Sequence, residues 1–234
     1  MSGLVCLPMY DWPETRGQVE AFHARMRVLV PELAETLTRP DSATALHALW
    51  RDPALMLGQT CWGPLRNGLA AHVALLGQPL YDDVPGGRGT QYRSAIVMRA
   101  GQGCPVPPDP GASLPDGLGS MRAAINARDS LSGCLALAED TGQPIVAPLV
   151  TGSHRASICA VAEGRADYAA IDCRSWAMAL EHEPAARKLV VTGWTALRPG
   201  LPFITARSTP PALRARLTRA LATLGAIPTL EETA

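Results

Sequence analysis

The chain has 234 residues, of which 47% are apolar, and its 21 Lys and Arg residues are balanced by 21 Asp and Glu residues. This apolar fraction is ample for a folded core. A net charge of zero excludes a global field that would draw the chain to nucleic acid or a membrane surface, so any charge on a ligand must be met locally. No run of about 18 apolar residues occurs, so no membrane insertion is expected.

The first residues, MSGLVCLPMYDWPE, lack the basic segment and the apolar stretch of a secretory signal. The sequence as written is therefore expected to be cytoplasmic, or periplasmic if a leader has been removed. Six cysteines are scattered through apolar contexts, without a C-x-x-C pair or a histidine at metal-ligand spacing. We therefore expect reduced thiols, no metal and no cofactor.

Apolar runs of strand length alternate with segments of helical period in the first part of the chain. The first strand is predicted from Leu4 to Tyr10, and a helix begins near Thr15 and Gln18, which stand in the relation of a capping box. A glycine-rich loop covers residues 81–90. The remaining strands of this part are expected at Leu55–Gly58, His72–Leu76 and Tyr92–Arg99. Residues Pro64–Leu69 are long enough for only a brief helix.

The strand, turn and helix pattern repeats after an irregular loop that is dense in proline and glycine, residues 101–119. Helices are expected to begin at Ser130, at Ser153 and at Pro210, and Gly225 would end the last of them. Strands are expected at Arg122–Asn126, Ile145–Val150, Tyr168–Asp172, Leu189–Thr192 and Phe203–Ala206. This alternation predicts an α/β architecture with mostly parallel strands.

Two strand-to-helix turns carry small hydroxyl residues, at 126–134 (NARDSLSGC) and at 151–155 (TGSHR). The start of a helix presents unpaired N–H groups and the positive end of its dipole to an anion. Candidate ligand-binding residues in these turns are Ser130, Ser132, Gly133, Ser153, His154 and Arg155. Each has a plainer interpretation, namely a helix cap, a solvent-exposed histidine or a surface ion pair.

A third turn, Gly58–Trp62, follows a predicted strand, and its Gln59 and Thr60 could face the same space as Tyr10 from the first strand. Polar groups at the carboxyl ends of strands are where open α/β sheets bind ligands. The alternative is that Gln59 and Thr60 satisfy only their own turn.

Catalytic motifs are hard to find in this sequence. Neither SLSGC nor TGSHR supplies the G-x-S-x-G of a serine hydrolase, and CWGPLR is one residue too short for a cysteine phosphatase loop. His182-Glu183 is followed by no second histidine, so it is not a zincin motif, and no P-loop lysine motif is present. The sequence therefore favours a binding protein over an enzyme.

Six blocks, taken in order, resemble the phosphate/phosphite/phosphonate-binding proteins of ABC transporters. They are LPMYDWPE, GQTCWGPL, Tyr92-Arg93-Ser94, DSLSG, TGSHRASICAVAEGRADYAAIDCRSW and PGLPFIT. The resemblance spans nearly the whole chain, and its most specific block runs from Thr151 to Trp176.

The resemblance implies a type II periplasmic-binding-protein fold with two α/β lobes, residues 1–88 plus 195–234 and residues 89–194. Crossing segments near 85–95 and 190–200 would join the lobes and act as hinges. One small oxyanion would be held in the cleft between them. Ser130, Ser132, Ser153 and His154 would donate to it, Tyr10 and Gln59 would close from the first lobe, and Asp172 would accept from a ligand hydroxyl, amine or protonated oxygen.

Three functions follow from this resemblance. The first is a solute-binding component that serves an ABC permease. The second is a cytosolic ligand sensor, in line with the missing secretion signal. The third is an enzyme on the same fold that resembles those of menaquinone biosynthesis, with His154 and Asp172 as acid or base. Arg155 stands where aminophosphonate binders commonly have an acidic residue, which disfavours a zwitterionic ligand.

Overall fold

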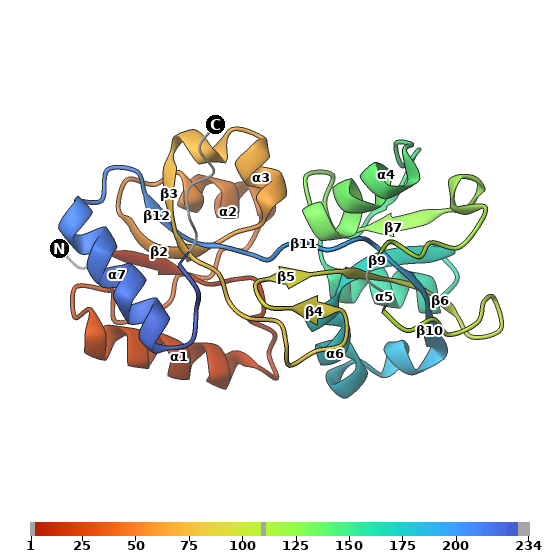
Figure 1. Ribbon diagram of the computed structural model, residues 1–234, viewed down its shortest axis with the longest axis horizontal. Helices are drawn as coiled ribbons and strands as arrows, with labels where there is room; N and C mark the ends of the chain where they lie inside the picture. The colour runs from red at the N-terminus through yellow and green to blue at the C-terminus, as the bar shows by residue number, and fades with distance from the viewer. Residues whose placement is uncertain (1–2, 109–110, 229–234) are drawn as a thin grey trace. The chain divides into compact units, whose positions relative to one another are not determined.

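The computed structural model describes residues 3–108 and 111–228, and the chain divides into two compact units. Unit 1 consists of residues 1–80 and 200–234, and unit 2 of residues 81–199. The chain therefore passes from one unit to the other twice. Each unit contains its own sheet with flanking helices, which confirms the α/β class (Figure 1).

Unit 1 is built on a four-stranded sheet with helices on both faces. Its strands, in the order β1-β2-β12-β3, are Leu4–Cys6, Leu55–Gln59, Phe203–Ala206 and Val73–Gly77. Its helices are α1 (Arg16–Leu29), α2 (Ala43–Trp50), α3 (Trp62–Arg66), the short 3-10 helix η1 (Leu69–Ala71) and α7 (Pro211–Thr223). Phe203 packs with α1 and α7, whereas Ile204 packs with α2 and α3, so alternate residues of β12 serve the two faces.

Unit 2 is built on a five-stranded sheet and a small three-stranded one. The larger sheet has the order β10-β6-β9-β7-β8, with strands Leu189–Trp194, Ser94–Arg99, Tyr168–Asp172, Ala123–Ile125 and Leu149–Val150. The smaller sheet pairs β11 (Arg198–Pro199), β5 (Gln91–Tyr92) and β4 (Gly87–Arg88). The helices are η2 (Leu118–Ser120), the π-helical η3 (Leu131–Leu135), α4 (Ala136–Thr141), α5 (His154–Ala162), α6 (Cys173–His182) and η4 (Pro184–Lys188).

In each main sheet one strand runs against all the others, namely β12 in unit 1 and β6 in unit 2. In chain order, β6 is the first strand of the main sheet after the chain crosses into unit 2. In the same way, β12 is the first strand after the chain crosses back into unit 1. The prediction of mostly parallel strands therefore holds for the two main sheets apart from these two strands, whereas the small sheet of unit 2 is antiparallel throughout.

Several predicted elements are shorter than the sequence suggested, and proline explains two of them. The first strand ends at Cys6, before Pro8, and the strand expected from residue 145 is confined to Leu149–Val150, after Pro148. Proline cannot donate a ladder hydrogen bond, so it limits pairing at these positions. Helix α2 lies in a segment for which no element was predicted.

The divisions between the units fall at residues 80/81 and 199/200, whereas the sequence suggested 88/89 and 194/195. Packing explains the difference. Tyr81 is fully buried against the ring of Tyr92, with 5.5 Å between their centroids, and β11 pairs with β5. The segment from Tyr81 to Arg88 is therefore a structural part of unit 2.

Among the described residues, no helix combines the length and the apolar character that crossing a bilayer requires.

The tight packing of the first crossing segment can be tested at Gly87. A Cβ atom there would stand 1.9 Å from the carbonyl oxygen of Tyr81, so Gly87→Ala is expected to lower the free energy of unfolding by about 1–3 kcal/mol or more. Gly17→Ala is the matched control, because nothing lies within 4 Å of a Cβ on this residue of α1. Chemical denaturation should show the control equal to or more stable than the parent. Equal stability of Gly87→Ala would contradict this packing.

Candidate functional site

Three neighbouring parallel strands of unit 2 end at one edge of its main sheet. Strand β7 pairs in parallel with β9 on one side and with β8 on the other. Because the carboxyl ends of parallel strands share an edge, the segments that follow these strands come together there. They are the turn after β7 that leads to η3, the turn after β8 that leads to α5, and the junction of β9 with α6.

The first of these segments contributes two serine hydroxyls. Ser130 is the N-cap of η3, and its Oγ accepts from the N–H of Gly133 at 3.1 Å. The Oγ atoms of Ser130 and Ser132 are 3.4 Å apart, and both residues are buried. The predicted serine pair therefore sits at a helix start, and Ser130 also serves as the cap that was its plainer interpretation.

The second segment contributes His154, the first residue of α5. Its Nε2 lies 2.9 Å from Ser132 Oγ and 3.3 Å from Asp172 Oδ2. Ser153 is the N-cap of α5, and its Oγ accepts from the N–H of Ala156 at 3.1 Å. The ring of His154 thus joins the first segment to the third.

The third segment contributes Asp172, the last residue of β9 and the N-cap of α6. Its Oδ1 accepts from the N–H of Ser175 at 2.9 Å, and only 4% of its side chain is exposed. A buried carboxylate is costly unless charged or polar groups surround it, and here a helix start and a histidine do so. Ser132, His154 and Asp172 form what we call the Ser-His-Asp cluster.

Burial lowers the pKa of His154 below its ordinary value of 6.5, and the negative charge of Asp172 opposes this effect. Burial is the larger influence, so the ring is neutral at neutral pH and carries one proton. An additional negative charge placed beside Nε2 would favour the imidazolium form.

The Ser-His-Asp cluster does not have the geometry of a catalytic triad. In a triad the carboxylate holds one ring nitrogen and the serine contacts the other. Here both Ser132 and Asp172 approach Nε2, while Nδ1 of His154 is buried and has no hydrogen-bond partner among the described residues. This arrangement cannot relay a proton from serine to aspartate through the ring.

Arg155 follows His154 in the sequence, but its side chain is bound elsewhere in unit 2. Its Nε donates to Glu183 Oε2 at 2.7 Å, and a terminal guanidinium nitrogen donates to the carbonyl oxygen of His182 at 3.3 Å. This matches the plainer interpretation of Arg155 as one half of an ion pair.

The residues predicted from the first lobe lie in unit 1. Gln59, at the end of β2, is buried and donates from Nε2 to the carbonyl oxygen of Leu201 at 3.3 Å. Thr60 is fully buried, and its Oγ1 has no partner among the described residues. Tyr10 is half-buried, and its carbonyl oxygen accepts from Thr15 Oγ1 at 2.7 Å. Gln59 thus has a partner within its own unit, whereas the hydroxyl of Thr60 does not.

Two polar residues at the same edge of the unit 2 sheet were not among the predicted site residues. Ser94, at the start of β6, is directly opposite Asp172 in the β6–β9 ladder, and its buried Oγ has no partner among the described residues. Asn126 follows β7, and the same is true of its Oδ1. Ser94 belongs to a sequence block that resembles the family, and Asn126 to the candidate turn at 126–134. The sequence could not single them out, because only the folded structure shows whether a side chain has a hydrogen-bond partner.

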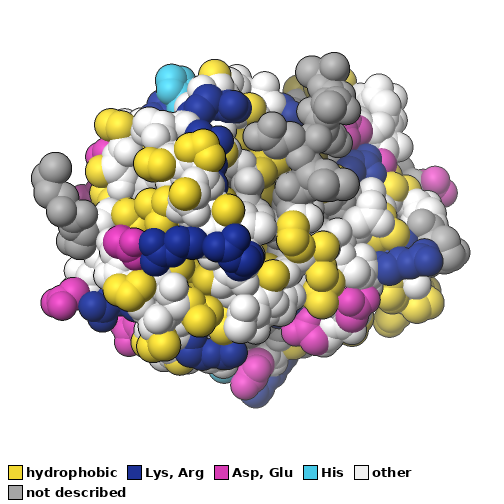
Figure 2. Space-filling view, turned by 60° about the vertical axis from the view of Figure 1, so that its left-hand side comes forward, with side chains coloured by type: hydrophobic (Ala, Val, Ile, Leu, Met, Phe, Trp, Pro, Cys, Tyr) yellow, Lys and Arg dark blue, Asp and Glu magenta, His cyan; other side chains and the backbone are white. Residues whose placement is uncertain are grey.

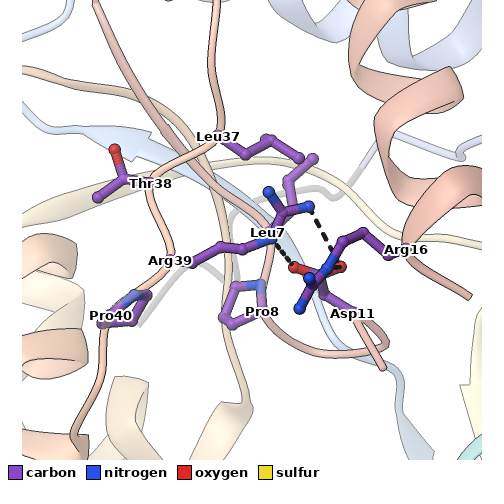
Figure 3. A pocket seen from close by; sticks show the side chains of 8 residues that line it. All are labelled: Leu7, Pro8, Asp11, Arg16, Leu37, Thr38, Arg39 and Pro40. Atoms are coloured by element: carbon purple, nitrogen blue, oxygen red, sulfur yellow. Dashed lines mark hydrogen bonds and ion pairs between the residues drawn. The ribbon is translucent and has the colours of Figure 1, made fainter. Parts of the chain in front are cut away.

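A hollow of about 240 Å³ lies in unit 1, and none of the predicted site residues is part of its lining, although Asp11 directly follows Tyr10 (Figure 3). Asp11 occupies its centre and accepts from Arg39 Nε at 2.5 Å, while Arg16 Nε is 3.9 Å from the same carboxylate. Its lining is Leu7, Pro8, Asp11, Arg16, Leu37, Thr38, Arg39 and Pro40. The carboxylate of Asp11 already neutralises one of the two guanidinium groups, so this hollow is a weaker candidate for an anion than the Ser-His-Asp cluster.

Charges of both signs are mixed on the face that Figure 2 shows, where basic and acidic side chains are interspersed among apolar ones. This agrees with the zero net charge of the sequence. In the described part of the chain, no group of three or more His, Cys, Asp or Glu side chains is arranged to hold a metal ion.

Several solved structures are similar to this chain over nearly its whole length. PhnD1 from Prochlorococcus marinus, in complex with methylphosphonate, superposes with a TM-score of 0.70 at 15% identity and covers 94% of this chain and 83% of its own. A binding-protein component of an ABC phosphonate transporter from Pseudomonas aeruginosa gives 0.66 at 15% identity, with 97% and 81% covered. The periplasmic VFT2 domain of BvgS from Bordetella pertussis gives 0.66 at 16% identity, with 94% and 87% covered. These similarities establish the type II periplasmic-binding-protein fold.

The fold therefore places the chain in the class of type II periplasmic-binding-protein folds. Residues 67–233 match the family model described as ABC transporter, phosphonate, periplasmic substrate-binding protein, and the chain belongs to this family. This is a family of solute-binding proteins and not of enzymes, which confirms the resemblance and the non-enzyme prediction. No curated protein sequence matches the chain.

The electrostatic role of Asp172 can be tested by Asp172→Asn, which keeps an N-cap acceptor but removes the charge beside His154. Because that charge opposes the effect of burial, the pKa of His154 is expected to fall further below 6.5 in the variant. An NMR titration of the His154 ring signals measures it. Asp116→Asn, at an exposed position, is the control. A His154 pKa that stays unchanged in Asp172→Asn would show that the two groups are not coupled.

Proposed function

We propose that the chain binds a small phosphonate-type oxyanion at the Ser-His-Asp cluster of unit 2, as the solute-binding component of an ABC uptake system. The observation that carries this proposal is the placement of Ser132 Oγ and His154 Nε2, 2.9 Å apart, at the edge where three parallel strands end. Family membership supports the ligand class, because the family is described as phosphonate-binding.

The donors at this edge suit an oxyanion. The hydroxyls of Ser130 and Ser132, the ring of His154 and the N–H groups at the starts of η3 and α5 can each donate to an oxygen. The dipoles of α5 and α6 add positive potential near Ser153 and Asp172. Gly133 is buried, and the absence of a side chain leaves room for Asn126 Oδ1, which would lie 1.9 Å from a Cβ at this position. The proposed set leaves out Arg155, since its guanidinium is bound to Glu183.

Asp172 favours a ligand oxygen that still carries a proton. Its Oδ2 lies 3.3 Å from His154 Nε2, so a ligand oxygen that contacts this nitrogen also comes near the carboxylate. A P–OH group can donate to that carboxylate, whereas a fully ionised oxyanion is repelled by it. This favours phosphonate, phosphite or phosphate over sulfate, which has no proton to offer at neutral pH.

In this role the chain would work in the periplasm, as the family description states for its members, and would pass its ligand to an ABC permease. Tyr10, Gln59 and Thr60 of unit 1 remain proposed ligand-binding residues. The buried Thr60 hydroxyl, which has no partner among the described residues, is the most suitable of the three.

Isothermal titration of ligand-free protein against methylphosphonate, phosphite, phosphate and sulfate tests the proposal. Wild-type protein is expected to bind at least one phosphorus oxyanion and to discriminate against sulfate. Ser132→Ala and His154→Gln should each weaken that binding about tenfold or more, because the first removes a hydrogen bond to the ligand and the second removes the positive charge that the ring can gain beside it.

The controls are Ser208→Ala and His72→Gln, which change exposed residues of unit 1. Both should bind like the wild type. Absence of binding to every phosphorus oxyanion, or equal affinity in Ser132→Ala, would overturn the proposed function or its site.

A further inference from the structure

Asn126 has a buried side-chain oxygen with nothing to accept from. Its Oδ1 has no hydrogen-bond partner among the described residues, although it comes directly after β7 at the edge that carries the proposed site. Buried amide oxygens are nearly always satisfied in folded proteins. An acceptor without a partner next to the proposed site therefore requires a donor.

The surrounding backbone places Asn126 beside His154. The carbonyl oxygen of Asn126 accepts from the N–H of Gly152 at 3.1 Å, in the turn that leads to His154. A Cβ on Gly133 would lie 1.9 Å from Asn126 Oδ1 and 3.3 Å from His154 Cε1. Asn126 Oδ1 and His154 Cε1 therefore both lie next to the Cα of Gly133. Any side chain at position 133 would collide with Asn126 Oδ1.

His154 has a buried ring nitrogen that could donate the hydrogen bond that Asn126 Oδ1 lacks. Its Nδ1 is buried and has no partner in the part of the chain that the structure describes, while its Nε2 faces Ser132 and Asp172. An imidazolium ring carries a proton on each nitrogen and requires an acceptor for both. Asp172 or a ligand oxygen can serve Nε2, so the remaining requirement is a neutral acceptor for the proton on Nδ1.

We propose that Asn126 is a positioning residue that accepts a hydrogen bond from His154 Nδ1–H when an oxyanion occupies the site. This inference rests on the proposed function, because the anion is what favours the imidazolium form. Both side chains lie next to the Cα of Gly133, which places the amide near the ring. The amide suits this role better than a carboxylate would, since it holds the ring without placing a second negative charge beside Asp172 and the ligand.

The charged surroundings of His154 are simple enough to interpret a pH profile. Asp172, at the junction of β9 and α6, is the charged group that acts on its pKa. From η3 it is faced by the uncharged Ser132, and from the turn after β7 by the uncharged Asn126. Arg155, on the same helix, is paired with Glu183.

The test measures the dissociation constant of methylphosphonate over a pH series for wild-type protein, Asn126→Ala and Asn126→Asp. Asn67→Ala, at an exposed position in unit 1, is the control. The ligand ionises in the same way in every experiment. The ratio of the variant's dissociation constant to that of wild type therefore reports only the change in the protein. The pKa of His154 in each complex is measured by NMR in parallel.

Asn126→Ala should bind about tenfold more weakly than wild type at low pH, with the ratio approaching one as pH rises and His154 becomes neutral in both complexes. The pKa of His154 in the complex should fall in Asn126→Ala and rise in Asn126→Asp. A weakening by the same factor at every pH, with an unchanged His154 pKa, would overturn the inference and leave the proposed function standing. No binding by wild type would overturn both. If Asn126→Ala does not fold, the rise in Asn126→Asp decides alone.

Discussion

The imidazole of His154 holds the proposed site together, because its Nε2 lies within reach of both Ser132 and Asp172. These three residues belong to segments that are far apart in sequence, and only the parallel pairing of β9, β7 and β8 brings them to one edge. The geometry of the sheet is thus the constraint on which the site depends. Any shift in the register of β7 would separate Ser132 from His154.

The same geometry distinguishes the proposed binding site from a hydrolytic active site. Serine, histidine and aspartate are the side chains of a hydrolytic triad, but both neighbours approach a single ring nitrogen. What remains is a set of donors at helix starts around a histidine that can take up one proton. A carboxylate beside those donors makes the site sensitive to whether a ligand oxygen carries a proton.

The sequence predicted much of this arrangement. Alternating strands and helices indicated two repeats of an α/β theme, and the small hydroxyl residues at helix starts pointed to Ser130, Ser132 and His154. Asp172 entered through the family resemblance alone. Contacts within the fold determined the rest: Arg155 pairs with Glu183 28 positions away, and Tyr81 packs into unit 2 through Tyr92. Asn126 and Ser94 have no distinctive local pattern, since their open hydrogen-bonding groups are a property of the folded edge.

A titration of isotope-labelled protein with methylphosphonate, followed by backbone amide NMR, tests the central claim most directly. The account predicts that the largest shifts in unit 2 occur at the helix starts that surround the Ser-His-Asp cluster, namely residues 131–134, 154–156 and 173–175. Shifts confined to the hollow around Asp11, Arg16 and Arg39 in unit 1, with none at these helix starts, would contradict it.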